Sequence, residues 1–191
     1  MAEELYDSIR LISYGLFLLC SKKGEKYNGC IVNTIFQITS KPQMIAVSLS
    51  KDNYTHEFVK KSKVFTASVL CQDTPMKFIG RFGFRSGRDF DKFAEPLDID
   101  LFITGAPIVQ NYSLGYLEGV VKDAVDCGTH TLFIAKVVGG KITKNGIPLT
   151  YAYYHKVKHG KAPKNAPTFF EQLSGTTVVT VSYTHLTLPT N

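Results

Sequence analysis

The sequence predicts a mainly β protein, a sandwich or closed barrel of six or seven strands with two or three short helices. Apolar and polar residues alternate over several short segments, which is the period of a half-buried strand. Short polar turns separate the early segments, so we expect neighbouring strands to run antiparallel. Strands and helices do not alternate repeatedly, and no dinucleotide fingerprint or P-loop is present. Both facts argue against a doubly wound nucleotide-binding fold.

The first quarter of the chain predicts a short amphipathic helix over 3–10 and then three strands. Residues 11–20 are almost continuously apolar, as in a strand buried on both faces. Residues 25–39 alternate throughout and predict one long second strand, with a bulge at 28–29. After a turn, we expect a third strand over 44–50.

The middle of the chain predicts two helices around one strand. We expect the first helix over 55–62, with Asn53 or Thr55 as its N-cap, and the strand over 64–71. The Thr-Pro pair at 74–75 predicts the start of the second helix, because proline is favoured at the first helical position.

The second half of the chain is expected to return to strands. Residues 113–126 fit either a helix or a strand, and their glycines and valines favour a strand. Residues 130–138 predict another strand. The Asn-Gly pair at 145–146 predicts a type I′ hairpin turn between strands at 141–143 and 147–149.

Length and composition indicate a single domain. We expect this domain over 1–155, a basic, proline-containing linker over 156–168, and a tail over 169–191 that is not a functional module. The tail has no charged residue after Glu171, an abrupt change from the linker.

The charge and the cysteines narrow the choice of partners. A net charge of +6 favours anionic partners. No nucleic-acid-binding motif and no apolar run near ~20 residues appears, so we expect neither nucleic acid nor membrane as a partner. The four cysteines form no C-x-x-C pair and the polar start is no signal peptide, which favours reduced thiols in a cytoplasmic protein.

Three groups of residues carry candidate chemistry, and each has a structural alternative. Hydroxyls, a lysine and a helix start suit a phosphate, with helix capping as the alternative: Ser48, Ser50, Lys51, Asn53 and Thr55. An arginine- and glycine-bearing loop suits an anion, with a solvated loop as the alternative: Arg81, Arg85, Ser86, Gly87 and Arg88. His130 opens an apolar strand, where a structural histidine is the alternative.

We expect no metal site and no side-chain catalytic set. His155 and His159 have metal-ligand spacing only within a helix, and they stand at the predicted linker. The spacing assembles no nucleophile–base–acid group, which is expected where a cofactor carries the chemistry.

Four ordered motifs resemble the flavin reductase-like family, the FMN-binding split barrels. NGCIVNTIFQITSKPQMIAVSLSKDNYTHEFV is similar to the family core, and PMKFIGRFGFRSGRDFDKF to its glycine-bearing loop. GTHTLFIAKVV resembles a family strand, with Ala135 where glycine is usual. PLTYAYYHKVKHGKAPKNAPTF is most similar to the flavin domain of high-molecular-weight rubredoxins and flavoredoxin-like proteins.

The resemblance implies a six-stranded antiparallel Greek-key split barrel that forms a homodimer and binds FMN. It implies reduction by NADH or NADPH and transfer of electrons to a rubredoxin, a flavodiiron protein, free flavin or oxygen. A flavin-binding electron carrier that is reduced by a protein partner is the alternative. High-molecular-weight rubredoxins continue into a C-x-x-C iron module, and no such pair follows Pro167 here. The chain is then a stand-alone flavin domain, or its C-terminus is missing or replaced.

The resemblance also implies roles for individual residues. Those expected near the isoalloxazine ring are Asn33, Thr34 and Gln37. Contacts to the ring edge or the ribityl chain are expected from Ser48, Leu49 and Ser50. The phosphate is expected on Lys51, Asn53 and Thr55, with Arg85, Ser86 or Arg88 completing the charge match. His130 is expected to face the flavin or the nicotinamide.

Overall fold

The computed structural model describes residues 8, 9 and 11–169. The tail predicted over 169–191 therefore lies outside the described residues except for its first residue, as does most of the helix predicted over 3–10. None of the described helices is long and apolar enough to cross a membrane.

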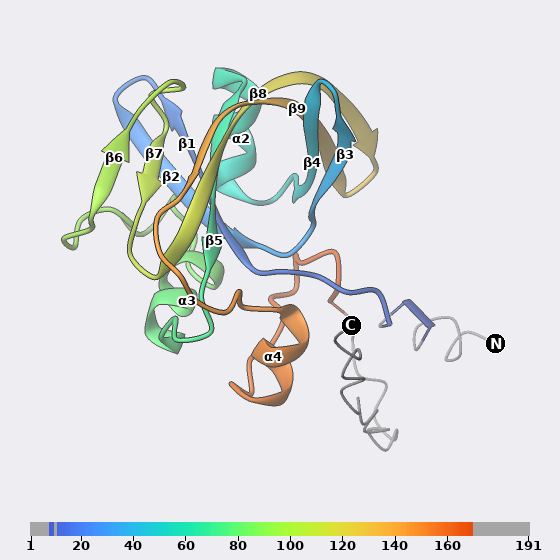
Figure 1. The fold of residues 1–191 in the computed structure, drawn as a ribbon, viewed down its shortest axis with the longest axis vertical. Coiled ribbons are helices and arrows are strands. Elements are labelled where there is room, and N and C mark those ends of the chain that lie inside the picture. Colours follow the sequence, from blue (N-terminus) through green and yellow to red (C-terminus); the bar gives the residue numbers. More distant parts are fainter. Residues whose placement is uncertain (1–7, 10, 170–191) are drawn as a thin grey trace, which may run out of the picture.

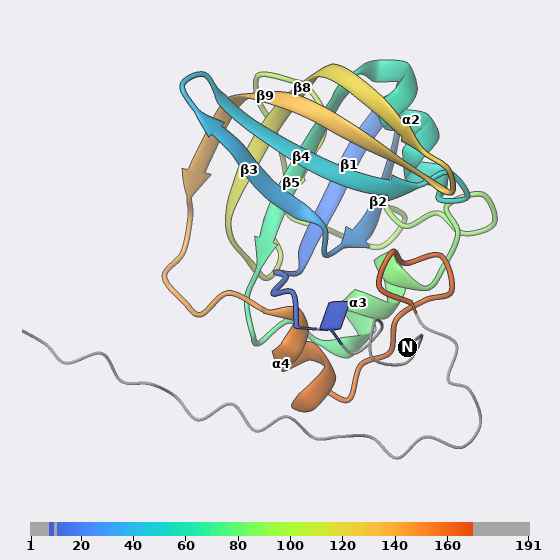
Figure 2. The ribbon, with the colours of Figure 1, turned by 90° about the vertical axis from the view of Figure 1, so that its right-hand side faces the viewer.

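The described residues form one seven-stranded antiparallel sheet that curves into a barrel (Figures 1 and 2). Its strands, in sheet order, are β2 (Lys26–Val32), β1 (Phe17–Lys23), β5 (Val64–Leu70), β8 (Ser113–Cys127), β9 (His130–Ile142), β4 (Gln43–Ser50) and β3 (Ile35–Ser40). A separate two-stranded sheet consists of β6 (Ile99–Leu101) and β7 (Pro107–Val109). The predicted mainly β class is confirmed.

The single strand predicted over 25–39 is divided into β2 and β3 by Asn33 and Thr34. β2 pairs with β1, whereas β3 pairs with β4 at the other end of the sheet order. The two outermost strands are therefore joined by two residues, which brings the two edges of the sheet together. This division explains why the described sheet has seven strands where six were expected.

The hairpin predicted around residues 145–146 is wrong. β9 continues to Ile142, and the next two residues, Thr143 and Lys144, both donate their backbone N–H groups to the carbonyl of Leu114. The predicted strand over 147–149 contributes only an isolated bridge between Pro148 and Cys71. The strand interpretation of 113–126 is correct, since β8 covers it.

In the described part of the chain, the helices α2 (Tyr54–Ser62), α3 (Met76–Gly83) and α4 (Tyr151–Lys156) pack around the sheet. Asn53 is the N-cap of α2, and its Oδ1 accepts from the Thr55 N–H at 3.0 Å. We expected Thr74 to cap the second helix and Pro75 to be its first residue, but the N-cap of α3 is Pro75, without a side-chain cap bond.

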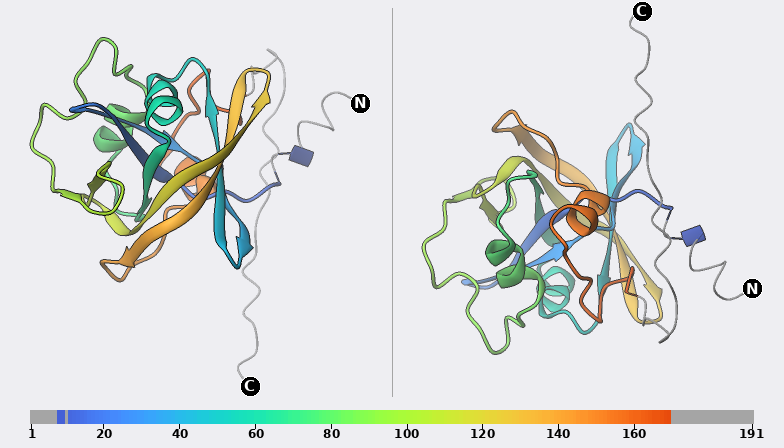
Figure 3. Two further views of the ribbon diagram at one scale, coloured as in Figure 1. Left: turned by 90° about the horizontal axis from the view of Figure 1, so that it is seen from above. Right: turned by 90° about the horizontal axis from the view of Figure 1, so that it is seen from below.

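Two apolar clusters stabilise this arrangement. One fills the barrel and includes Phe65, Phe133 and Leu49. The other lies between β1 and the helices α3 and α4, and includes Phe82 and Tyr154. Figures 2 and 3 show α3, α4 and the segment after α4 gathered at one end of the barrel. That end contains the pockets described next.

Candidate functional site

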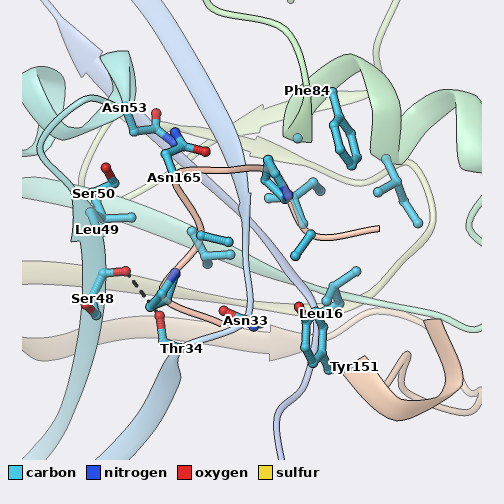
Figure 4. Close-up of a pocket in the computed structure, with 18 of the residues that line it drawn as sticks. Leu16, Asn33, Thr34, Ser48, Leu49, Ser50, Asn53, Phe84, Tyr151 and Asn165 are labelled. Atoms are coloured by element: carbon cyan, nitrogen blue, oxygen red, sulfur yellow. Dashed lines mark hydrogen bonds between the residues drawn. The ribbon is translucent and has the colours of Figure 1, made fainter. Parts of the chain in front are cut away.

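The break between β2 and β3 opens onto a pocket (Figure 4). Thr34 Oγ1 donates to the Ser48 carbonyl at 3.1 Å, and the Ser48 N–H donates to the Thr34 carbonyl at 3.2 Å. Asn33 is only 6% exposed, and its Nδ2 donates to Thr168 Oγ1 at 2.9 Å. Both residues line the pocket because the chain changes pairing partners here, which frees local backbone from a continuous ladder.

The end of β4 forms the second wall of this pocket with Ser48, Leu49 and Ser50. Figure 4 shows these three residues along one strand, facing Tyr151 and Leu16 across the pocket. The first pocket thus has a polar edge and an apolar, aromatic opposite side, which is the usual composition of a small-molecule site.

The start of α2 links this pocket to a second one. Asn53 lines both pockets, so the first turn of the helix stands between them. Thr55 does not line either pocket: it is fully buried and its Oγ1 accepts from Asn28 Nδ2 at 3.3 Å. Asn53 is therefore the member of the predicted helix-start group that reaches both spaces.

The second pocket is cationic and has a cavity volume of about 440 Å³. The loop after α3 supplies Arg85 and Ser86, both expected from the sequence. Asp52 is the acidic residue of the lining, and its four basic residues are Arg85, Lys92, Lys161 and Lys164. This excess of positive charge suits an anion such as a phosphate.

Lys92 is a buried cation that the sequence did not single out. It is 4% exposed, and its Nζ donates to the Gly29 carbonyl at 2.8 Å and the Phe82 carbonyl at 3.1 Å. Burial lowers the pKa of Lys92, and the neighbouring thiols of Cys30 and Cys20 oppose this shift. The two carbonyls hold the ammonium at the wall of the second pocket.

Two cations expected at a phosphate are engaged elsewhere. Lys51 Nζ contacts both carboxylate oxygens of Asp126, at 2.7 and 2.8 Å, on the exposed surface. The hydrogen bond from Lys51 is the main reason that the pKa of Asp126 is lowered. Arg88 pairs with Glu57 and lies over the ring of Tyr54. Neither Lys51 nor Arg88 lines either pocket.

His130 and Gln37 also lie outside both linings. His130 pairs with Ser50 between β9 and β4, so its side chain shares a sheet face with a pocket residue. Its Nδ1 bonds to Thr129 Oγ1 at 2.9 Å, whereas its buried Nε2 has no hydrogen-bond partner among the described residues. Gln37 is exposed on β3 and donates to the Thr39 carbonyl.

A second histidine, His56, packs beneath this corner. It is 6% exposed, its Nε2 lies 2.9 Å from Thr131 Oγ1, and its ring contacts that of Phe133. Burial is the main cause that lowers the pKa of His56, and the positive charges of Lys60 and Lys51 add to the shift. The neutral imidazole therefore connects α2 to β9.

The comparisons with known proteins agree with this geometry. Residues 9–160 match the family described as "Flavin reductase like domain". The chain belongs to this family. The flavin reductase-like fold therefore accounts for the barrel.

Two curated relatives are similar over most of the flavin reductase-like chain. A high molecular weight rubredoxin of Moorella thermoacetica is 46% identical, covering 85% of this chain and 70% of that protein. A ferric-chelate reductase (NAD(P)H) of Archaeoglobus fulgidus is also 46% identical, covering 84% of this chain and 94% of that one.

A solved structure supports the same assignment. The styrene monooxygenase flavin reductase of Pseudomonas putida S12 superimposes with a TM-score of 0.64 at 26% identity, covering 75% of this chain and 88% of that one. The flavin reductase-like split barrel that the sequence resemblance implied is thereby confirmed as the fold.

The pocket residues that the sequence did not single out lie far away along the chain. Lys92, Lys161 and Lys164 reach the second pocket from the loop after α3 and from the predicted linker. The dense basic run at 156–164 was the available signal. Among the described residues, no cluster of three or more potential metal ligands is present.

Proposed function

We propose that the chain binds FMN and passes electrons from NADH or NADPH through the flavin to an acceptor. One observation carries this proposal: the polar strand-end pocket adjoins a cationic pocket, and Asn53 lines both. FMN has a ring with a polar edge at one end and an anionic phosphate at the other, joined by a ribityl chain. The polar pocket and the cationic pocket therefore lie in the order that FMN would require. The family membership supports the flavin, and the pocket charge favours a phosphorylated form.

The residues present fit this cofactor. Thr34, Ser48 and Ser50 offer hydroxyl and backbone groups to a ring edge, while Leu16 and Tyr151 offer apolar surface to its face. Arg85 lines the cationic pocket that would hold the phosphate, and the buried Lys92 adds positive charge to its lining. Asn53 Oδ1 accepts from the Thr55 N–H, and Asn53 lines both pockets between the ring edge and the phosphate.

Bound flavin would supply the redox chemistry, accepting two electrons from a nicotinamide and releasing them to the acceptor. The protein would exclude water from the ring with its apolar wall and stabilise the reduced, anionic form with its positive charge. His130 pairs with Ser50 on the neighbouring strand. Its Nε2, which has no hydrogen-bond partner among the described residues, would orient the nicotinamide.

The electron donor, the electron acceptor and the oligomeric state are also part of this proposal. The name of the Archaeoglobus relative includes NAD(P)H, which supports a nicotinamide donor. The Moorella relative is named a rubredoxin, which supports a redox protein as acceptor, alongside a flavodiiron protein, free flavin or oxygen. We further propose that the chain acts as a cytoplasmic homodimer, that residues 1–155 form the flavin-binding domain and that 169–191 adds no function.

Anaerobic titration of the purified chain tests the function. FMN-loaded protein should show the visible absorption band of oxidised flavin, and NADH or NADPH should bleach it. A flavin band that neither nucleotide bleaches, but that a reduced protein partner does, would identify an electron carrier. A chain that binds no flavin would refute the proposal.

His130→Ala tests the proposed role of the histidine. Reduction of bound FMN, followed by stopped-flow absorbance, should slow about tenfold because the nicotinamide loses an orienting group. FMN affinity should stay unchanged, since His130 lines neither pocket. Reduction at the unaltered rate would remove His130 from the mechanism.

A further inference from the structure

The segment 160–168, here called the strap, forms a wall of both pockets. Lys161, Ala162, Pro163 and Asn165 line the two pockets together, and Lys164 lines the cationic one. Figure 4 places Asn165 next to Asn53 at the junction of the pockets. The strap begins where the family match over residues 9–160 ends, and it falls within the segment that resembles the flavin domain of high-molecular-weight rubredoxins.

Both ends of the strap are held by tyrosines of α4. At its start, Tyr154 Oη donates to the Lys161 carbonyl at 3.0 Å, and the Gly160 N–H donates to the Tyr154 carbonyl at 3.0 Å. At its end, Asn33 Nδ2 donates to Thr168 Oγ1, which donates to Tyr151 Oη at 2.7 Å. The second attachment joins the strap to the β2–β3 break as well as to α4.

The middle of the strap is held much less. Its internal backbone bond joins the Ala166 N–H to the Pro163 carbonyl at 2.9 Å, a single turn with a proline on each side. The side chains of Lys161 and Lys164 are exposed and make no ion pair with any described residue. Among the described residues, no hydrogen bond or ion pair joins residues 162–165 to the barrel, so the strap can move outward between its two anchors without breaking one.

The space below the strap requires such movement. With the strap in place, the first pocket has a cavity volume of about 60 Å³, whereas small-molecule sites typically have about 300–1,000 Å³. A three-ring isoalloxazine needs more room than this. The cationic pocket, by contrast, has room for a phosphate with the strap where it is.

The two lysines of the strap are the cations of the second pocket that are best placed to bind a phosphate. Lys51 and Arg88 are committed to Asp126 and Glu57, and Lys92 already donates to two carbonyls. Lys161 and Lys164 supply two of the four cations of the second pocket and have no competing carboxylate among the described residues.

We propose that the strap lifts to admit the flavin and then closes over it, with Lys161 and Lys164 holding the phosphate. This inference rests on the proposed flavin function and names the segment that would hold the phosphate. A phosphorylated flavin should therefore bind more tightly than riboflavin, and the difference should shrink as salt screens the two lysines.

The double variant Lys161→Gln/Lys164→Gln separates charge from shape. In the full chain, the FMN dissociation constant, measured by quenching of flavin fluorescence, should rise about tenfold while that of riboflavin changes less than twofold. Lys158→Gln is the matched control, because it removes one charge from the same basic run at a residue that lines neither pocket. An unchanged FMN constant, or an equal loss for both flavins, would overturn the phosphate assignment.

Tyr154→Phe tests closure separately, since it removes one anchor and leaves the lysines in place. FMN and riboflavin should both dissociate several-fold faster, because either flavin lies under the same strap. Unchanged dissociation rates would overturn the closing motion. An unaltered chain that binds neither flavin would refute the proposed function, an outcome distinct from both of these.

Discussion

Two regions of the barrel satisfy a buried polar side chain in opposite ways. Glu118 is 1% exposed, and its carboxylate accepts from the Thr104 N–H at 2.7 Å, the Thr104 hydroxyl at 2.8 Å and the Ile103 N–H at 3.4 Å. Asn33 is almost as buried, yet its amide bonds to Thr168, 135 residues away. The hydrogen-bond partners of the Glu118 carboxylate come from the turn between β6 and β7, whereas the partner of the Asn33 amide comes from the strap.

The difference separates structural from functional polar residues. A carboxylate with several donors from one turn holds that turn, and any ligand would have to compete with all of them. An amide whose partner belongs to a movable segment can exchange this partner for a ligand. Although both side chains are buried, mutation of Glu118 should therefore reduce stability, whereas mutation of Asn33 should reduce ligand binding.

Glu118→Ala should give the largest effect. Removing the carboxylate leaves the buried donors of Thr104 without an acceptor, so the free energy of unfolding should fall by about 3 kcal/mol. Urea denaturation measures this change. FMN affinity of the folded variant should stay within twofold. Glu118→Gln, which keeps an acceptor oxygen, should lose less, and equal stability of all three proteins would break the comparison.

Asn33→Ala should act on binding instead. The FMN dissociation constant should rise about tenfold because the pocket loses a buried donor, whereas the free energy of unfolding should fall by less than about 1 kcal/mol. Asn28→Ala is the matched control: Asn28 is 2% exposed, bonds to Thr55 and lines neither pocket. Its variant should lose stability and keep FMN affinity; the reverse pattern would contradict this distinction.

His56 is, like Glu118, a buried polar residue with a structural role. Its titration should make the free energy of unfolding depend on pH. It faces Thr131 and Phe133 of β9, and the charges that act on it are those of Lys60, Lys51 and Glu57. Because its pKa is lowered from 6.5 in the fold, the unfolded chain binds this proton first as the pH falls below about 6.5. The free energy of unfolding should therefore decrease with falling pH in that window.

Thermal melts of the unaltered chain and of His56→Gln between pH 7.5 and about 5 check this sign. The variant should lose part of the pH dependence below 6.5, although it should be less stable than the unaltered chain at pH 7.5. Parallel curves would show that another group titrates.

Lys51→Gln should have the smallest effect on FMN. Its ammonium is bonded to Asp126 and lies outside both pockets, so the dissociation constant should change less than twofold in equilibrium titration. A tenfold loss would restore the phosphate role that the sequence resemblance implies for Lys51, and would mean that the ion pair opens when flavin binds.

Periodicity predicted the strands well because burial repeats every two residues. It did not reveal the division of 25–39, because alternation continues while the partner strand changes from β1 to β4. The Asn-Gly pair at 145–146 misled for a related reason. A turn sequence forms a hairpin only if a strand lies on each side, and here the backbone bonds instead to Leu114 of β8.

The strand-end part of the candidate site was predictable because its residues are close in the sequence. Asn33, Thr34, Ser48 and Ser50 all line the first pocket. Of the charged part, Arg85 and Ser86 were expected and line the second pocket. The absence of Lys51 and Arg88 from it was not predictable, since the partner of each of these cations comes from elsewhere in the fold. Asp126 takes Lys51 from 75 residues away, and Glu57 takes Arg88 from 31 residues away.

The division of one long strand between two neighbours also has a kinetic consequence. β1 with β2, and β3 with β4, are local hairpins whose contacts require little loop-closure entropy, whereas β5 must find β8 across more than forty residues. Asn33 and Thr34 connect those two hairpins. The hydrogen bonds between Thr34 and Ser48 should therefore form early, before the pairing of β5 with β8. The Ser48 N–H, which donates to the Thr34 carbonyl, should gain hydrogen-exchange protection ahead of the amides that join β5 to β8.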